Sequence, residues 1–155
     1  MYLVEYETKY KEDVENYFLT DEMKYYTGAP QDNIIISEKN PKHHSILAYS
    51  ETNLVTFFVL DEDSDKLTYT NEPQSMLLRS FSTDSRYVRQ GHAKESLRLL
   101  PDFVKATYPE IKEIVLAVNI KNESAQNLYK QVGFVDKGVR RNGKKGELIV
   151  LSYDI

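Results

Sequence analysis

The residues that could do chemistry gather in one short segment, residues 86–97, which reads RYVRQGHAKESL. Its one glycine (Gly91) and a small residue (Ala93) are flanked by two cations, Arg89 and Lys94. The first backbone N–H groups of a helix lack partners and carry partial positive charge, which suits a phosphate or a diphosphate. Small side chains let such a ligand approach the backbone, and Gly91 can adopt φ values that other residues avoid. An ordinary strand-to-helix turn is the alternative that this segment alone leaves open.

The segments on either side of this turn predict a strand–helix–strand unit. Residues 76–83 read as a strand, and residues 91–107 read as a helix with one apolar face. Residues 113–118 are apolar, as in a central strand that is covered on both faces and paired in parallel. Such a unit is right-handed and places a ligand beyond the carboxyl end of its first strand, where the turn lies. Pro101 lies inside the helical pattern and predicts a kink or a restart there.

The rest of the chain predicts further strands and helices around this unit. Upstream, the patterns favour a strand over residues 2–6, helices over residues 12–19 and 21–26, and a hairpin over residues 45–50 and 54–60. We expect Asp21 to cap the second helix, whereas residues 32–40 fit either a strand or a helix. Downstream, a helix over residues 122–132 and a hairpin over residues 135–140 and 147–153 follow. We find no repeat or linker, so residues 1–155 are expected to form a single domain.

Charge is distributed unevenly along the 155 residues. Residues 1–75 hold 15 acidic and 6 basic residues, a net of −9, while residues 76–155 hold 9 acidic and 14 basic residues, a net of +5. A basic half that carries the turn suits an anionic cofactor, and an acidic half suits a cationic substrate such as an amine. Charges that merely lie on solvated faces would give the same counts. The overall net charge of −4 argues against nucleic acid as a partner.

Several other functions are disfavoured by composition. The chain has no cysteine, which excludes disulfides and thiolate chemistry. It has neither an apolar run long enough to cross a membrane nor a secretory signal pattern, so we expect a cytoplasmic protein without a membrane partner. We expect no metal site. Asp61, Asp63 and Asp65 imitate a calcium loop, but Lys66 occupies the position that requires glycine.

A second motif covers residues 122–134, which read NESAQNLYKQVGF. Together with the turn and the order of elements over the whole chain, this run resembles the GCN5-related N-acetyltransferases, whose pattern is N-x-x-A-x-x-L-Y-x-x-x-G-F. The turn in that family reads Gln/Arg-x-x-Gly-x-Gly/Ala. Gly91 and Ala93 match it, whereas Val88 replaces the usual polar residue and Arg89 stands where a glycine is common.

The resemblance implies an α/β (α+β) fold: a mixed central sheet with antiparallel N-terminal strands, a parallel splayed pair at the cofactor site, and helices on both faces. It also implies acetyl-CoA as the acetyl donor. The diphosphate would lie on the amides of the turn, which comprises Arg89, Gln90, Gly91, His92, Ala93 and Lys94. The pantetheine arm would pair with Phe81, Ser82 and Thr83 as an added strand would. Asn122 is a further candidate for contact with the cofactor, although helix capping alone explains it.

The reaction implied by the resemblance is direct transfer of an acetyl group to a primary amine while both substrates are bound. Backbone N–H groups near Ser82 and Thr83 would polarise the thioester carbonyl. Tyr129 matches the position of the general acid in the family. A phenol suits that role, because it stays protonated at neutral pH and can protonate a thiolate. A tyrosine that only packs on the helix face is the alternative.

Four questions stay open at this point. The strand over residues 76–83 has no carboxylate, so we assign no general base, and Glu72, His92 and an N-terminal carboxylate stay as alternatives. The expected acceptor is a small-molecule amine, but no pattern identifies it. A non-catalytic acyl-CoA-binding or sensing module is the rival function. Homodimers are frequent in the family, so a homodimer is one of the states to consider.

Overall fold

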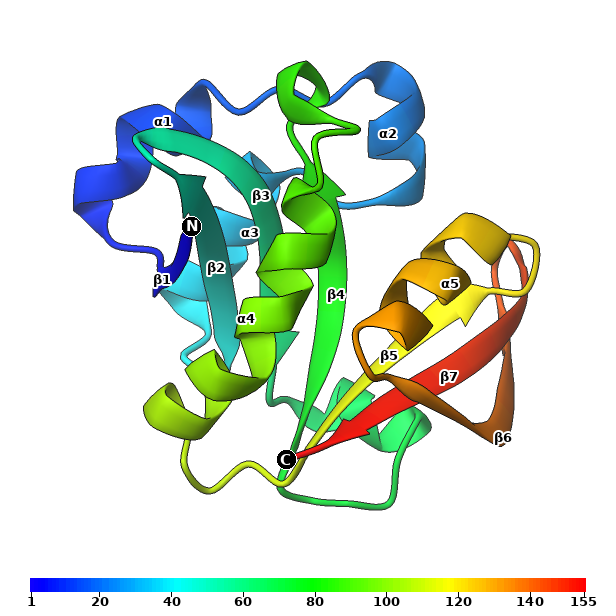
Figure 1. Ribbon diagram of the computed structural model, residues 1–155. Helices are drawn as coiled ribbons and strands as arrows, with labels where there is room; N and C mark the ends of the chain where they lie inside the picture. Colours follow the sequence, from blue (N-terminus) through cyan, green and yellow to red (C-terminus); the bar gives the residue numbers. More distant parts are fainter.

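The computed structural model describes all 155 residues as one seven-stranded sheet with helices on both faces (Figure 1). The strand order is β1-β2-β3-β4-β5-β7-β6, and every neighbouring pair is antiparallel except β4 and β5. The strands are β1 (Tyr2–Glu5), β2 (His43–Ser50), β3 (Asn53–Asp61), β4 (Ser75–Thr83), β5 (Glu113–Asn119), β6 (Val135–Gly143) and β7 (Gly146–Asp154). The expected mixed sheet with one parallel pair is confirmed.

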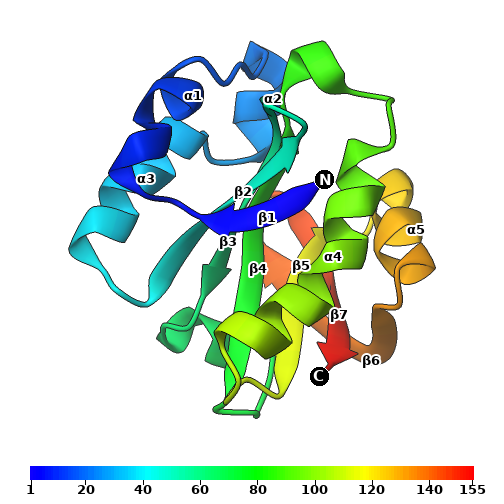
Figure 2. The same ribbon diagram turned by 60° about the vertical axis from the view of Figure 1, so that its left-hand side comes forward.

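Two hydrophobic cores lie on opposite faces of the sheet. On one face, α4 (His92–Thr107) and α5 (Glu123–Gln131) lie side by side (Figures 1 and 2). Leu97 and Leu100 of α4 share one hydrophobic core with Ile114 of β5. On the other face, α1 (Lys11–Glu15) and α3 (Pro30–Lys39) cover the antiparallel strands. No helix is long and apolar enough to span a membrane.

The two parallel strands part soon after they meet. Residues 75–77 of β4 pair with residues 113–115 of β5, and no pair follows. β4 nevertheless continues to Thr83 and β5 to Asn119, so their carboxyl-terminal parts diverge (Figure 1). The facing edge of β4 beyond Leu77 therefore has backbone N–H and C=O groups without a partner strand. This is the gap that the resemblance implies.

A β-bulge in β4 redirects its side chains beside this gap. Arg79 pairs with Val59 and Ser82 with Phe57, so two residues of β4, Ser80 and Phe81, lie opposite one residue of β3. Ser80 has a φ of 55°, a left-handed value that is uncommon outside glycine. The extra residue reverses the alternation of faces. Phe81 consequently packs on the core shared with α4 and α5.

The helices upstream of β2 differ from the sequence-based prediction in three details. α1 ends at Glu15 rather than at Leu19, because Gln31 donates hydrogen bonds to the carbonyls of Val14 and Tyr17 and the amide of Phe18 binds Asp84. Thr20, not Asp21, caps α2 (Asp21–Tyr26). The ambiguous segment over residues 32–40 belongs to helix α3, which begins at Pro30.

The long helix α4 does not restart at its internal proline. It runs without interruption from His92 to Thr107, with Pro101 buried on its inner face. Pro101 removes one backbone donor, but burial of its ring beside Leu97, Leu100 and Val104 offsets part of that cost. Helix packing therefore overrides the local breaking tendency of proline.

Candidate active site

The turn before α4 presents a row of unpaired backbone amides. None of the N–H groups of residues 89–94 donates a hydrogen bond, and the first amide of this region that does so is that of Glu95, which binds the carbonyl of Gly91. Arg89 has a φ of 61° and Gly91 a φ of 83°. No atom lies within 4 Å of the place where a side chain at Gly91 would begin. This arrangement can accept an anion against the backbone.

Arg89, which departs from the family pattern, has a left-handed backbone conformation. A glycine at this position would adopt the left-handed backbone without cost, whereas Arg89 adopts it at the cost of some strain. Neither Arg89 nor Lys94 forms an ion pair within the chain. Both cations are therefore available to a ligand on the turn.

Asp84 fixes the segment that leads from β4 into the turn, and the sequence analysis did not identify it. Its carboxylate is fully buried and accepts hydrogen bonds from the amides of Phe18 and Arg86 and from the Arg86 guanidinium. Burial alone would raise the pKa of Asp84, but these hydrogen bonds outweigh it and lower the pKa. An Asp that ends a strand two residues before an Arg is the local signal that could have indicated this turn.

Tyr129 lies at the edge of the core beneath the gap. Its ring meets Phe81 edge to face, with centroids 6.2 Å apart, and also meets Phe134 at 5.9 Å. No hydrogen bond satisfies its hydroxyl within the chain, and burial raises the pKa of Tyr129 to about 12. The phenol is therefore a protonated donor that lies beside the unpaired part of β4.

The other predicted site residues of β4 and α5 fall on different sides of the sheet. Ser82 points away from α5 and exchanges a hydrogen bond of 2.9 Å with the buried Tyr17 hydroxyl. Phe81 faces Tyr129 as described, and Thr83 ends the strand opposite Thr56. Asn122 caps α5 through a 3.1 Å hydrogen bond from the amide of Ala125. For Asn122 and Ser82, structural roles account for the side chains.

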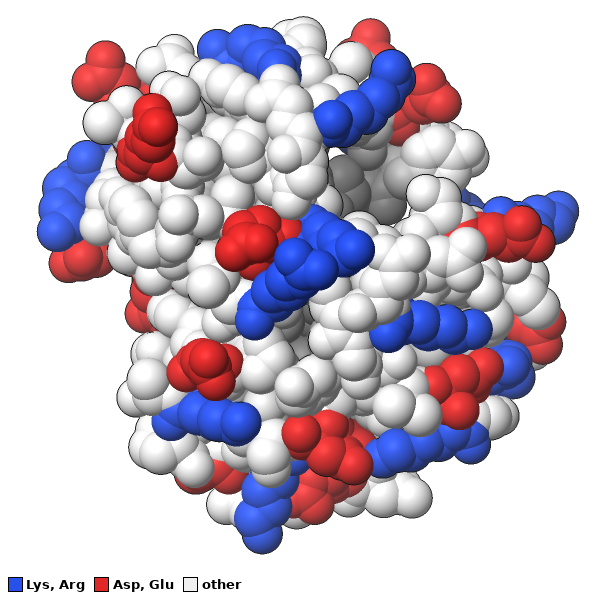
Figure 3. Space-filling model, in the orientation of Figure 1, with Lys and Arg blue, Asp and Glu red and all other residues white.

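A second wall faces β4 from α2 and the loop after it. A methyl group added at Gly28 would lie 3.0 Å from Asn33 Nδ2 and 3.2 Å from Ser80 Oγ, so a side chain there would crowd the bulge. On the other side, the Lys145 ammonium in the β6–β7 hairpin lies 3.8 Å from the centre of the Tyr25 ring and also binds the Tyr25 carbonyl. In Figure 3 the surface is hollowed between α2 and α5, above the diverging strands, with Lys or Arg side chains at the rim.

Glu72 and His92, two candidates for the general base, lie in different parts of the structure. Glu72 precedes β4, so it lies roughly 25 Å along the strand from Thr83, at the end of β4 that pairs with β5. His92 lies at the start of α4, where it meets the Tyr87 ring and hydrogen-bonds to Gln90 at 3.3 Å. Glu72 therefore cannot serve the reaction at Tyr129.

Comparison with known proteins gives the family. Residues 4–134 match the profile of the acetyltransferase (GNAT) family, which is most of the chain. The chain belongs to that family. It is 32% identical over 149 residues to the uncharacterized N-acetyltransferase YbbJ of Bacillus subtilis (strain 168), a match that covers 96% of this chain and 93% of the relative. The present protein is accordingly a GNAT-type N-acetyltransferase.

Solved structures of other acetyltransferases share the fold. Aminoglycoside acetyltransferase AAC(6')-Ib in complex with coenzyme A superposes with a TM-score of 0.76 at 11% identity, covering 98% of this chain and 93% of that one. The ribosomal-protein-S18-alanine N-acetyltransferase from Escherichia coli gives a TM-score of 0.66 at 17% identity, covering 99% and 93%. At these identities the likeness is one of fold, and the acceptors of these enzymes differ.

Proposed function

We propose that this GNAT acetyltransferase moves an acetyl group from acetyl-CoA to a primary amine by direct transfer within a ternary complex. The observation that carries the proposal is the row of six unpaired amides over residues 89–94, which continues the unpaired edge of β4. Phe81 brings that edge into contact with Tyr129. The turn that would bind an anion, the unpaired edge of β4 and the proton donor Tyr129 are thus adjacent to one another in that order.

The turn fits a diphosphate. Free N–H groups from consecutive residues, the start of a helix and open space at Gly91 suit phosphate oxygens. Arg89 and Lys94 would add charge-assisted hydrogen bonds. Because these binding groups are backbone amides, Val88 in place of the usual polar residue would leave them available to the ligand.

The gap fits the pantetheine arm. Its amides would pair with the free backbone groups of Phe81, Ser82 and Thr83, as a peptide pairs with the edge of a sheet. This pairing would hold the acetyl thioester, the activated group that acetyl-CoA supplies, below the bulge. A backbone N–H near Ser82 or Thr83 would then donate to the thioester carbonyl as negative charge develops there.

Tyr129 would hold the proton that the departing sulfur needs. The neutral amine nitrogen forms a bond to the acetyl carbon, the carbon–sulfur bond breaks, and the Tyr129 hydroxyl donates its proton to the sulfur. The proton that the nitrogen loses passes to water, and Tyr129 is reprotonated from solvent. A pKa of about 12 keeps the phenol protonated at any physiological pH. Alignment of the two reactants supplies up to about 7–11 kcal/mol of the barrier reduction.

The acceptor amine would enter from the side of α2 and the β6–β7 hairpin. Gly28 brings the loop after α2 against Ser80, so this wall adjoins the strand that binds the thioester. The net charge of −9 over residues 1–75, which include α2, favours a cationic acceptor. We assign no general base to this chain.

A thiol-release assay with an amine panel tests the proposal. The panel contains a polyamine, an aminoglycoside, free amino acids and a short peptide with a free N-terminus. We expect amine-dependent release of coenzyme A with at least one member, and calorimetry should show binding of coenzyme A alone. Binding without turnover across the panel would instead indicate a non-catalytic acyl-CoA-binding module.

A further inference from the structure

A pocket of about 290 Å³ lies on the sheet face opposite α4 and α5. Leu116 and Leu151 belong to the core under those helices, so the alternating side chains Val115, Val150 and Ser152 point to the other face. Val115 is also the last residue of β5 that pairs with β4. The pocket therefore begins at the closed end of the gap, away from the turn that would bind the diphosphate.

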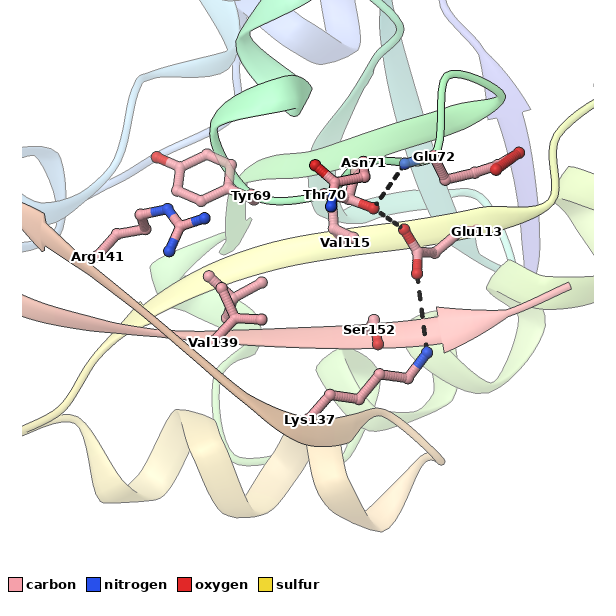
Figure 4. A pocket seen from close by; sticks show the side chains of 11 residues that line it. Tyr69, Thr70, Asn71, Glu72, Glu113, Val115, Lys137, Val139, Arg141 and Ser152 are labelled. Carbon is pink, nitrogen blue, oxygen red and sulfur yellow. Dashed lines mark hydrogen bonds and ion pairs between the residues drawn. The ribbon is translucent and has the colours of Figure 1, made fainter.

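A second bulge builds the roof of this pocket. The register between β6 and β7 shifts between Asp136 and Arg140, and Gly138 within the shift has a φ of 90°. The bulge bends β6 over the sheet. Arg141 then reaches the segment before β4, where its Nε donates a 2.7 Å hydrogen bond to the carbonyl of Thr68. The pocket is thus lined by β5, β6, β7 and residues 69–72 (Figure 4).

Three polar groups in the pocket lack close partners. The Ser152 side chain is buried, with 6% of the residue exposed, and its Oγ forms no hydrogen bond. Glu113 accepts a hydrogen bond from Thr70 through Oε1, but its Oε2 has only Lys137 Nζ at 3.8 Å. That ammonium lies closer to Asp154, at 3.2 Å. A buried hydroxyl without a partner and a carboxylate oxygen without a hydrogen bond cost free energy that a ligand can recover.

The third group is the Arg141 guanidinium, which uses Nε and one Nη on backbone carbonyls and leaves the other Nη without a partner. Figure 4 shows it beside the Tyr69 ring at one end of the pocket, with Glu113 and Lys137 at the other end. Val115, Val139 and Val150 line the space between them. The pocket therefore has a cationic end, an apolar middle and an end with an available carboxylate oxygen.

We propose that this pocket binds a short ω-amino acid or a zwitterion of similar size. The ligand carboxylate would lie on Arg141, its ammonium group on Glu113 and Ser152, and its methylene groups against the three valines. Glu72, Glu113, Lys137 and Arg141 sum to zero formal charge, which suits a ligand without net charge. Binding of such a ligand at this pocket does not require that the protein transfer an acetyl group.

Calorimetry or NMR titration with β-alanine, γ-aminobutyrate and ε-aminocaproate tests this site. Caproate and hexylamine, each with one of the two charges, are the matched controls. We expect saturable binding of at least one ω-amino acid and about tenfold weaker binding of each control, the value of one charge-assisted hydrogen bond. Absence of binding by all three ω-amino acids would overturn the proposal, as would equal binding of the single-charge controls.

Variants locate the bound ligand. Arg141→Gln should weaken binding about tenfold. Val139→Phe should abolish it by filling the pocket, while thermal melting and binding of coenzyme A stay unchanged. Ser152→Ala keeps the fold and weakens binding less than Arg141→Gln. Undiminished binding by folded Arg141→Gln and Val139→Phe proteins would place the ligand elsewhere and contradict the proposal.

Discussion

The rings of Phe81 and Tyr129 meet edge to face with centroids 6.2 Å apart and planes inclined by 76°. The contact joins β4, whose edge is unpaired beside the gap, to α5, which carries the candidate acid. It exists because the bulge at Ser80 turns Phe81 toward α5. β4, which leads into the turn, and α5, which belongs to the second motif, are far apart in the chain and are brought into contact here.

Tyr129→Phe removes the hydroxyl and keeps the ring against Phe81. We expect kcat to fall on the order of 100-fold, because proton donation to the leaving group is lost, while the Kd for coenzyme A is unchanged. Steady-state kinetics and calorimetry check both. Since the pKa of Tyr129 is about 12, its deprotonation should not reduce activity below about pH 10. Wild-type turnover by the Phe variant would contradict the assigned role.

The strain at Arg89 can be separated from its charge with two variants. Arg89→Gly and Arg89→Ala both remove the guanidinium, but only glycine adopts a φ of 61° without cost. We expect Arg89→Gly to be more stable than Arg89→Ala by about 1 kcal/mol in denaturant unfolding. Both should bind coenzyme A more weakly than the wild type if the cation contacts phosphate. Equal stability of the two variants would mean that the turn is not held in this conformation.

Asp84→Asn tests the fixation of the turn. The change removes the charged acceptor that binds the Phe18 amide and the exposed Arg86 guanidinium, and it should destabilise the fold by about 2 kcal/mol. The folded pKa of Asp84 is lowered, so its stabilising effect is present above the ordinary value near 4 and is lost as the pH falls through the lower folded value. Unfolding curves between neutral and acid pH should therefore converge for wild type and variant. A difference in the free energy of unfolding between wild type and variant that is constant at all pH values would argue against the ionisation of Asp84 described above.

His44 should make the free energy of unfolding depend on pH in the direction opposite to that expected for Asp84. It lies between Glu5 and Glu62, at 2.8 Å and 2.6 Å. Burial alone would lower the pKa of His44, but the two carboxylates outweigh it and raise the pKa. The stabilisation is therefore complete below about pH 6.5 and is lost as the pH rises through the raised folded value. The stability difference between wild type and His44→Gln should shrink from pH 6 to pH 9, and a difference that grows would contradict the arrangement.

The sequence predicts most of the site because its signals are local. Gly91 and the helical pattern after it locate the anion turn, and Asn122 and Gly133 delimit the helix that carries Tyr129. Each of these features depends on residues a few positions apart. Such patterns survive folding because neighbouring residues determine capping and backbone conformation.

The features that the sequence does not predict depend on distant partners. The bulge at Ser80 arises from the pairing of β4 with β3, and no pattern within β4 marks it. Asp84 acquires its role from Phe18, 66 residues away, and the same contact helps to end α1 before Tyr17. These relationships follow from tertiary packing, which overrides the helical periodicity over residues 12–19.

A crystal structure with bound coenzyme A tests the central claim most directly. The account predicts that the diphosphate accepts hydrogen bonds from amides of residues 89–94, that the pantetheine amides pair with β4 at Phe81–Thr83, and that the sulfur lies within hydrogen-bond reach of the Tyr129 hydroxyl. A complex in which coenzyme A leaves the turn empty, or in which the sulfur lies away from that hydroxyl, would contradict it.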